Sequence, residues 1–180
     1  MKEFKPLLLF LARFLGTYII LSLAYKLYLD QYLPHNNPDP FTKLTSDITA
    51  FGLNKCGFFS FSNIAENHPW MRLVVDGQVA SIVNEGCNAI SILIIFVSFI
   101  VAFYTNFKQT FLFILSGLAI LFVMNISRIM LLNYIFRYHA EYGKMAHDYL
   151  FPAIIYGSIV ILWIVWIKFF VTKYNKQNAK

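Results

Sequence analysis

The sequence predicts an all-α polytopic membrane protein, with about four transmembrane helices and a small extracytoplasmic segment that contains a β-hairpin. Hydrophobic residues make up 58% of the 180 residues and charged residues only 13%, whereas soluble domains usually carry about 25% charged residues. The apolar stretches are also long, and a helix needs about 20 mostly apolar residues to cross a bilayer. Three such stretches contain no Asp, Glu, Lys or Arg: Cys87–Phe107, Gln109–Ser127 and Tyr149–Ile167.

A fourth apolar stretch, Leu7–Leu29, is charged only at Arg13 and Lys26, near its ends, where long cationic side chains can reach the headgroups. No A-x-A-like cleavage site follows this stretch, so we interpret it as a retained anchor. The whole chain, 1–180, is then a single membrane domain. The predicted transmembrane helices are 7–29, 87–104, 110–134 and 149–170, and residues 30–86 form the extracytoplasmic segment.

The charges predict the orientation, because Lys and Arg concentrate on the cytoplasmic side of membrane proteins. Basic residues flank the start of the first helix, the turn between the second and third, and the end of the fourth: Lys2, Lys5, Arg13, Lys108, Lys168, Lys173, Lys176 and Lys180. Four crossings place both termini in the cytoplasm and the loop Tyr134–Asp148 outside. The net charge of +6 follows from this topology, and we do not expect nucleic-acid binding.

The extracytoplasmic segment begins with the turn-rich Gln31–Pro40. Residues Phe41–Asn67 show no sustained periodicity and predict irregular structure with one short helix. Two Val-containing runs in Trp70–Ile82 flank Asp76-Gly77, a strong hairpin signal. We therefore predict a β-hairpin that leads directly to Cys87.

Cys87 is predicted at the N-terminus of the second transmembrane helix. There the helix dipole and unpaired backbone N–H groups favour a thiolate and are able to bind an oxyanion. Two other interpretations stay open: Cys87 is a small apolar filler, or it forms a disulfide with Cys56. The usual redox signal, C-x-x-C, is absent from the sequence.

Arg128 lies inside the third predicted helix, Thr110–Tyr134, about 9 Å below its outer end. Asn125, three residues earlier, shares its face and makes a polar stripe on an apolar helix. A buried arginine is costly unless it faces protein or water. Arg128 therefore either serves a site or snorkels outward.

His147 immediately precedes the fourth predicted helix, with Asp148 as the predicted N-cap and Pro152 tolerated in the first turn. It is either a base or an ordinary polar residue near the interface. His68 and His139 are also predicted outside and compete for the role of base.

The predicted helices bring Cys87, Arg128 and His147 to one membrane face. A Cys–His pair is the minimum for an activated thiol nucleophile, and an arginine can stabilise a thiolate, an oxyanion or a substrate carboxylate. The three residues predict a thiol peptidase or transpeptidase, for which we expect no cofactor and no metal. The paired small residues Ser116-Gly117 and Gly157-Ser158 are predicted to permit close helix contacts.

The order of these residues, with Cys87 in EGCNAI, Arg128 in NISRI and His147 in AHDYLFP, resembles the exosortase/archaeosortase family of membrane transpeptidases. The resemblance covers Met71–Trp166, and the short length is similar to that of compact exosortase F-type members. It implies that Cys87 is the nucleophile and that Arg128 and His147 are catalytic. Many relatives have about twice as many helices, and many have Gly directly after the nucleophile, where this chain has Asn88-Ala89.

The resemblance implies an enzyme of the plasma (inner) membrane, with its site on the extracytoplasmic side. Such an enzyme cleaves the C-terminal sorting signal of exported proteins (a short motif, a membrane helix and a basic tail) and transfers the protein to a surface acceptor. Its expected partners are these exported proteins and membrane lipids. A homo-oligomer or a membrane partner is an open expectation for so small a chain.

Two alternatives use the same sequence differently. A membrane thiol-disulfide oxidoreductase would use Cys56 and Cys87 but would leave Arg128 and His147 without a role. A non-enzymatic subunit of a membrane complex would need no site at all.

Overall fold

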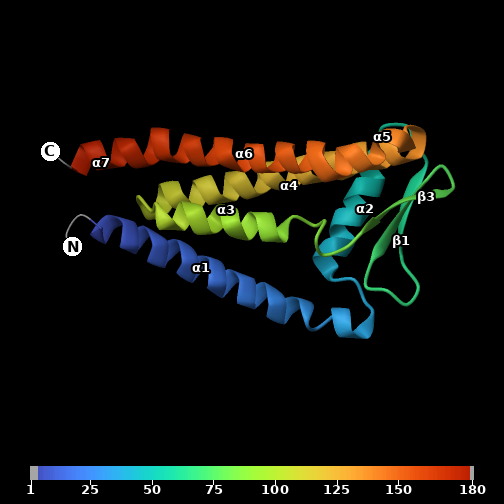
Figure 1. The fold of residues 1–180 in the computed structure, drawn as a ribbon, viewed down its shortest axis with the longest axis horizontal. Helices are drawn as coiled ribbons and strands as arrows, with labels where there is room; N and C mark the ends of the chain where they lie inside the picture. Colours follow the sequence, from blue (N-terminus) through green and yellow to red (C-terminus); the bar gives the residue numbers. More distant parts are fainter. Residues whose placement is uncertain (1–3, 179–180) are drawn as a thin grey trace.

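The computed structural model describes residues 4–178, which form an elongated bundle of helices with a small sheet at one end (Figure 1). The helices are α1 (Lys5–Leu29), the short 3₁₀ turn η1 (Leu33–His35), α2 (Pro40–Lys55), α3 (Ile90–Ala102), α4 (Phe107–Tyr138), α5 (Ala140–Met145), the π-helical turn η2 (Ala146–Leu150), α6 (Phe151–Val165), the π-helical η3 (Trp166–Val171) and α7 (Thr172–Asn178). The strands are β1 (Ser60–Ile64), β2 (Met71–Val75) and β3 (Gln78–Val83).

Three helical segments of residues 4–178 are long and apolar enough to cross a membrane: Leu7–His35, Phe107–Tyr138 and Ala140–Gln177. The prediction of a polytopic membrane protein is therefore confirmed. The second predicted span, 87–104, contains the shorter helix α3. Its 13 residues extend about 20 Å, less than the hydrocarbon thickness of about 30 Å.

The two ends of the elongated molecule are built from different elements (Figure 1). One end, called here the terminal end, holds the start of α1, the end of α7 and the turn between α3 and α4. The opposite end, called here the sheet end, holds α2, the three strands and α5. The predicted basic residues Lys2 and Lys180 lie outside the described residues.

Helices α3, α4 and α6 pack around one apolar core, and its fully enclosed residues are Phe96, Ile100, Leu121, Ile159 and Trp166. The Trp166 indole N–H donates to the Phe103 carbonyl over 3.1 Å and so satisfies a backbone acceptor at the end of α3. A Cβ built at Gly117 would lie 2.2 Å from the Phe96 ring, so this glycine does permit a close helix contact. Gly157 has no atom within 4 Å of such a Cβ.

Helix α2 is longer than the short helix predicted within Phe41–Asn67. Asp39 caps its start, because its carboxylate accepts hydrogen bonds from the backbone N–H groups of Phe41 and Thr42. Its buried face is mostly hydroxyl and small residues, Thr42, Thr45, Ser46, Thr49, Ala50 and Leu53. A helix is predicted from apolar residues that recur with a period of about 3.6, and the buried face of α2 is largely polar. The sequence pattern therefore did not reveal the full length of this helix.

The predicted hairpin is confirmed as β2 and β3, joined by Asp76-Gly77 with φ angles of 47° and 77°. Positive φ at both central residues is the geometry of a type I′ turn. A further strand, β1, pairs antiparallel with β2 and gives the order β1-β2-β3. The sheet packs on α2 and α4 through a core of Ala50, Met71, Leu73, Val83 and Ile129.

The fourth transmembrane segment begins earlier than predicted. Helix α4 continues to Tyr138, and after His139 the chain is helical again from Ala140. His147 and Asp148 therefore lie inside a helix, in the turn η2, and the prediction that Asp148 is a helix N-cap is wrong.

Candidate functional site

A cavity of about 430 Å³ at the sheet end brings together a thiol and an imidazole. Its walls come from β3, from the loop before α3, from α4 and from η2. The lining residues are Val79, Ala80, Ser81, Ile82, Cys87, Leu132, Phe136 and His147. Two of the three predicted site residues, Cys87 and His147, therefore line the same cavity although 60 positions of sequence separate them.

Cys87 is half-buried in the turn between β3 and α3, three residues before the helix begins at Ile90. The prediction that it starts the helix is thus wrong by three residues. Its backbone is fixed on both sides: its N–H donates to the Asn84 carbonyl over 2.9 Å, and its carbonyl accepts from the Asn125 amide over 2.9 Å. A loop held in this way keeps the thiol in one position at the cavity wall.

The next residue, Asn88, is fully buried and ties the same loop to two other helices. Its amide N–H₂ donates to the hydroxyls of Tyr25 (3.0 Å) and Thr42 (2.9 Å), and its carbonyl accepts from Ile90 N–H (2.9 Å). Thr42 in turn donates to Asp39 over 2.5 Å. The sequence analysis did not single out Asn88, because a lone asparagine beside a turn carries no signal of burial.

His147 is half-exposed, and its ring is oriented by a carboxylate. Its Nδ1 lies 2.8 Å from Asp148 Oδ1, while Lys144 Nζ lies 2.7 Å from the other oxygen of the same carboxylate. Because an ionised carboxylate only accepts hydrogen bonds, Nδ1 is the donor in this contact, and in the neutral imidazole this leaves the lone pair on Nε2. Asp148 thus has the geometry of a third group that orients a base, a role the sequence analysis missed.

Arg128 does not line the cavity that contains Cys87. It lines a neighbouring cavity of about 210 Å³ between α4 and α6. Its Nη1 donates to Asn125 Oδ1 over 3.3 Å, which confirms that the two residues share a face of α4. Since the Asn125 amide nitrogen holds the Cys87 carbonyl, a single side chain connects Arg128 to the loop that carries the thiol. Among residues 4–178, Arg128 Nε is buried without a hydrogen-bond partner.

The other candidate side chains lie elsewhere. The His139 ring contacts Tyr134 at the break between α4 and α5, and His68 stacks on Trp70 with ring centroids 4.3 Å apart. Cys56 is exposed at the end of α2, and both cysteines are free thiols. The structure therefore gives no support to the Cys56–Cys87 disulfide.

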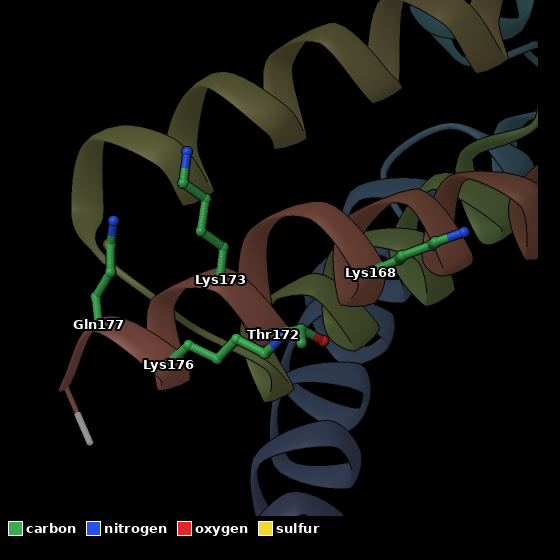
Figure 2. Close-up of a pocket in the computed structure, with 5 residues that line it drawn as sticks. All are labelled: Lys168, Thr172, Lys173, Lys176 and Gln177. Carbon is green, nitrogen blue, oxygen red and sulfur yellow. The ribbon is translucent and has the colours of Figure 1, made fainter. Parts of the chain in front are cut away.

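A cavity of about 460 Å³ lies far from Cys87, at the terminal end, and is lined by Lys168, Thr172, Lys173, Lys176 and Gln177. Lys173 and Gln177 extend on the side of α4, while Lys168 points away from them (Figure 2). This lining contains no thiol, imidazole or carboxylate. It agrees with the basic cluster predicted from the sequence, and it offers no group for acyl transfer.

A comparison with family models gave a match over most of the chain. The family model described as transmembrane exosortase matches residues 7–170, which include all residues that line the cavity of Cys87 and all but the last part of the third candidate membrane span, Ala140–Gln177. Searches of curated proteins and of solved structures gave no match. Because the match covers most of the chain, the protein belongs to the transmembrane exosortase family.

Proposed function

We propose that this protein is a membrane cysteine transpeptidase, with Cys87 as nucleophile and His147 as general base. Membership of the exosortase family supports a membrane transpeptidase or protease. The observation that carries the finer proposal is the shared cavity, which exposes a held thiol and a carboxylate-oriented imidazole to the same space. The proposed substrates are exported proteins that end in a short motif, an apolar helix and a basic tail.

The reaction has two halves. His147 Nε2 takes the proton from Cys87 Sγ as the sulfur attacks the carbonyl carbon of the scissile peptide bond. The tetrahedral intermediate then collapses: the C–N bond breaks, His147 gives its proton to the leaving amine, and a thioester remains on Cys87. An acceptor amine or hydroxyl, or water, loses a proton to His147 and attacks the thioester. The C–S bond breaks and the thiol is restored.

Arg128 supplies positive charge next to the nucleophile loop. Its guanidinium holds Asn125, and Asn125 holds the carbonyl of Cys87. Charge at such a position stabilises a thiolate or an oxyanion more strongly than it would in water, because the surrounding helices lower the local dielectric constant. Among residues 4–178 its Nε is buried without a hydrogen-bond partner, so a substrate carbonyl or carboxylate would accept from it only if binding opened that position.

The proposed setting is the plasma (inner) membrane, with both termini in the cytoplasm and the sheet end outside. The Lys-rich terminal end supports this orientation through the positive-inside rule. The substrate's own membrane helix would pack in the lipid layer beside α3, α4 and α6 and so align the scissile bond with the cavity.

The first test uses an epitope-tagged exported protein from the same genome that carries such a C-terminal signal. Cys87→Ser and His147→Ala should abolish or strongly reduce its processing in cells, since removal of a general base costs about 10²–10⁴-fold. The matched controls, Cys56→Ser and His139→Ala, should retain most processing, because neither residue lines the cavity. Immunoblots of membranes check that each variant is present at the wild-type level.

Normal processing by Cys87→Ser would reject the transpeptidase proposal. If Cys56→Ser were equally inactive, and both thiols resisted alkylation until reduced, a thiol-disulfide oxidoreductase would replace it.

A further inference from the structure

We propose that the outer edge of β3 is the substrate-docking site, where an extended peptide of the exported protein adds a strand to the sheet and presents its scissile carbonyl to Cys87. This inference rests on the proposed function and deepens it, because it names the element that binds the substrate and the conformation that the substrate adopts.

The backbone of β3 has a free side. β3 is an edge strand in the order β1-β2-β3, and edge strands present unpaired N–H and C=O groups. Among residues 4–178, the backbone groups of Val79–Ile82 have no hydrogen-bond partner outside the ladder with β2. The opposite edge is partly closed, because the Asn54 amide accepts from Ser60 N–H (3.1 Å) and donates to Ser60 C=O (2.5 Å).

The ladder pattern identifies a residue whose N–H faces outward. Ser60 is the partner of Val75 in the register, but its backbone N–H and C=O bond to the Asn54 side chain and so point away from β2. The backbone groups of Val75 therefore face β3, where they bond with Gln78. Directly opposed pairs alternate between hydrogen-bonded and non-bonded in an antiparallel ladder. The next residue, Val79, therefore directs its N–H and C=O away from β2.

The cavity follows this edge. Four successive residues, Val79 to Ile82, line it. The register of β2 and β3 shifts at Leu73/Val74, so Ala80 has no partner on β2 and the regular alternation of side chains is interrupted there. The facing wall is Leu132, Phe136 and His147, and the same space reaches Cys87. Val79 and Ile82 are 55% and 50% exposed, so apolar side chains of a docked peptide would find apolar neighbours there.

The direction of β3 fixes the direction of the docked peptide. Successive residues from the hairpin turn to Cys87 bond to α4 at positions ever closer to its N-terminus. Asp76 accepts from Tyr138, the Ser81 hydroxyl donates to Asn133 over 2.9 Å, and Cys87 C=O accepts from Asn125. β3 thus runs from the far end of the molecule toward the lipid layer. A substrate whose exported domain lies outside and whose membrane helix follows the scissile bond runs the same way, so it pairs parallel to β3.

This mode of binding has a consequence for specificity. Main-chain hydrogen bonds along about 10 Å of β3, from Val79 to Ile82, bind any extended peptide without regard to its sequence. Alternate side chains of the peptide face the apolar wall of Leu132 and Phe136. We expect substrates to carry small or apolar residues at alternate positions just before the scissile bond.

The test replaces one outward N–H. Val79→Pro removes a donor from the free edge but leaves the ladder with β2 intact, so processing of the tagged exported protein should fall about tenfold or more. Ser62→Pro is the matched control: Ser62 lies two residues after Ser60 and therefore also faces outward, but on β1. It should process the substrate normally. Membrane levels of both variants are compared by immunoblot.

A second experiment measures substrate binding at β3 directly and does not depend on turnover. In a Cys87→Ser background, a photoreactive amino acid at Ile82 should cross-link the uncleaved tagged substrate. The same amino acid at Ile64, which is 44% exposed on β1, should not.

Normal processing by Val79→Pro at the wild-type membrane level would overturn strand addition. If that variant is poorly inserted, the cross-link decides, and equal or absent capture at Ile82 and Ile64 would reject the proposal. The two proposals fail separately: active Cys87→Ser rejects the transpeptidase, whereas inactive Cys87→Ser with fully active Val79→Pro rejects only docking on β3.

Discussion

At the scale of single residues, two buried asparagines determine where the thiol of Cys87 lies. Asn88 and Asn125 are each fully buried, and each uses its amide as donor and acceptor at once. A buried amide that loses one of these partners costs about 1–3 kcal/mol. The loop that carries Cys87 is therefore held both by its own Asn88 and by Asn125 of the neighbouring helix α4.

The first residue-scale prediction concerns Arg128. Arg128→Lys should insert normally but process substrate roughly 10- to 100-fold more slowly, because an ammonium group is a point charge without the planar fork that can hold Asn125 and still reach a second acceptor. Cellular processing of the tagged substrate measures it. The control is Arg72→Lys, since the Arg72 guanidinium hydrogen-bonds to Asn63 and Ile64 of β1. Full activity of Arg128→Lys would show that Arg128 merely snorkels.

Residue types at the site could be predicted, but most of their partners could not. Cys87 and His147 were predicted to lie at one membrane face because their order and their positions near apolar stretches are visible in the sequence, and in the structure both line one cavity. Asp148 looked like a helix cap because a short polar stretch precedes an apolar run. Its contact with His147 depends on a helix that starts earlier, at Ala140.

At the scale of elements, the helices differ from the prediction mainly at their ends. Helix α4 extends to Tyr138 because the sheet and α2 pack against its last turns and bury Leu132 and Asn133 there. Periodicity in the sequence reports apolar faces, and it does not report that a separate segment covers the end of a helix. The same reasoning explains why α2, with its hydroxyl-rich buried face, was predicted only as a short helix.

An element-scale prediction concerns the contact between α3 and α4. Gly117→Ala should lower the unfolding temperature in detergent, because the new Cβ would lie 2.2 Å from Cζ of Phe96, whose ring is fully buried in the helix core. Overpacking of this kind costs about 1–3 kcal/mol. Gly157→Ala is the control: it meets no atom within 4 Å and should be neutral or slightly stabilising. Equal unfolding temperatures for the two variants would contradict the close contact.

At the scale of the whole molecule, the lengths of the helices place the site relative to the lipid. Helix α4 has 32 residues and is about 48 Å long, well beyond a hydrocarbon layer of about 30 Å. If the layer begins near Phe107, it ends close to Arg128, and Tyr138 extends about 15 Å beyond Arg128 among α2 and the sheet. The guanidinium then lies at the boundary of the layer, where its insertion cost is small.

The whole-molecule prediction is topological. In a chain that carries Cys56→Ser and Cys87→Ser, a cysteine at Asn37 should react with an impermeant thiol reagent applied to intact cells. A cysteine at Asn175 should react only after the membrane is opened. Both positions are exposed: Asn37 lies just before α2, an element of the sheet end, and Asn175 lies in α7, at the terminal end (Figure 1). The reverse labelling pattern would place the cavity in the cytoplasm and would rule out exported proteins as substrates.

The shortness of α3 has a consequence for water at the site. The helix covers only about 20 Å of its crossing, so the remaining depth is crossed by the unwound residues Asn84–Ala89. Peptide groups outside a helix are not tolerated against lipid tails, only against protein or water. Here the side chains of Asn125 and Tyr25 donate to the carbonyls of Cys87 and Glu85, Asn84 accepts from the N–H groups of Gly86 and Cys87, and Cys87 borders the cavity. If the protein acts on membrane-anchored substrates as proposed, we expect the interrupted helix to leave a hydrated notch at the edge of the bilayer, where a substrate leaves its own helix and exposes a peptide bond to attack.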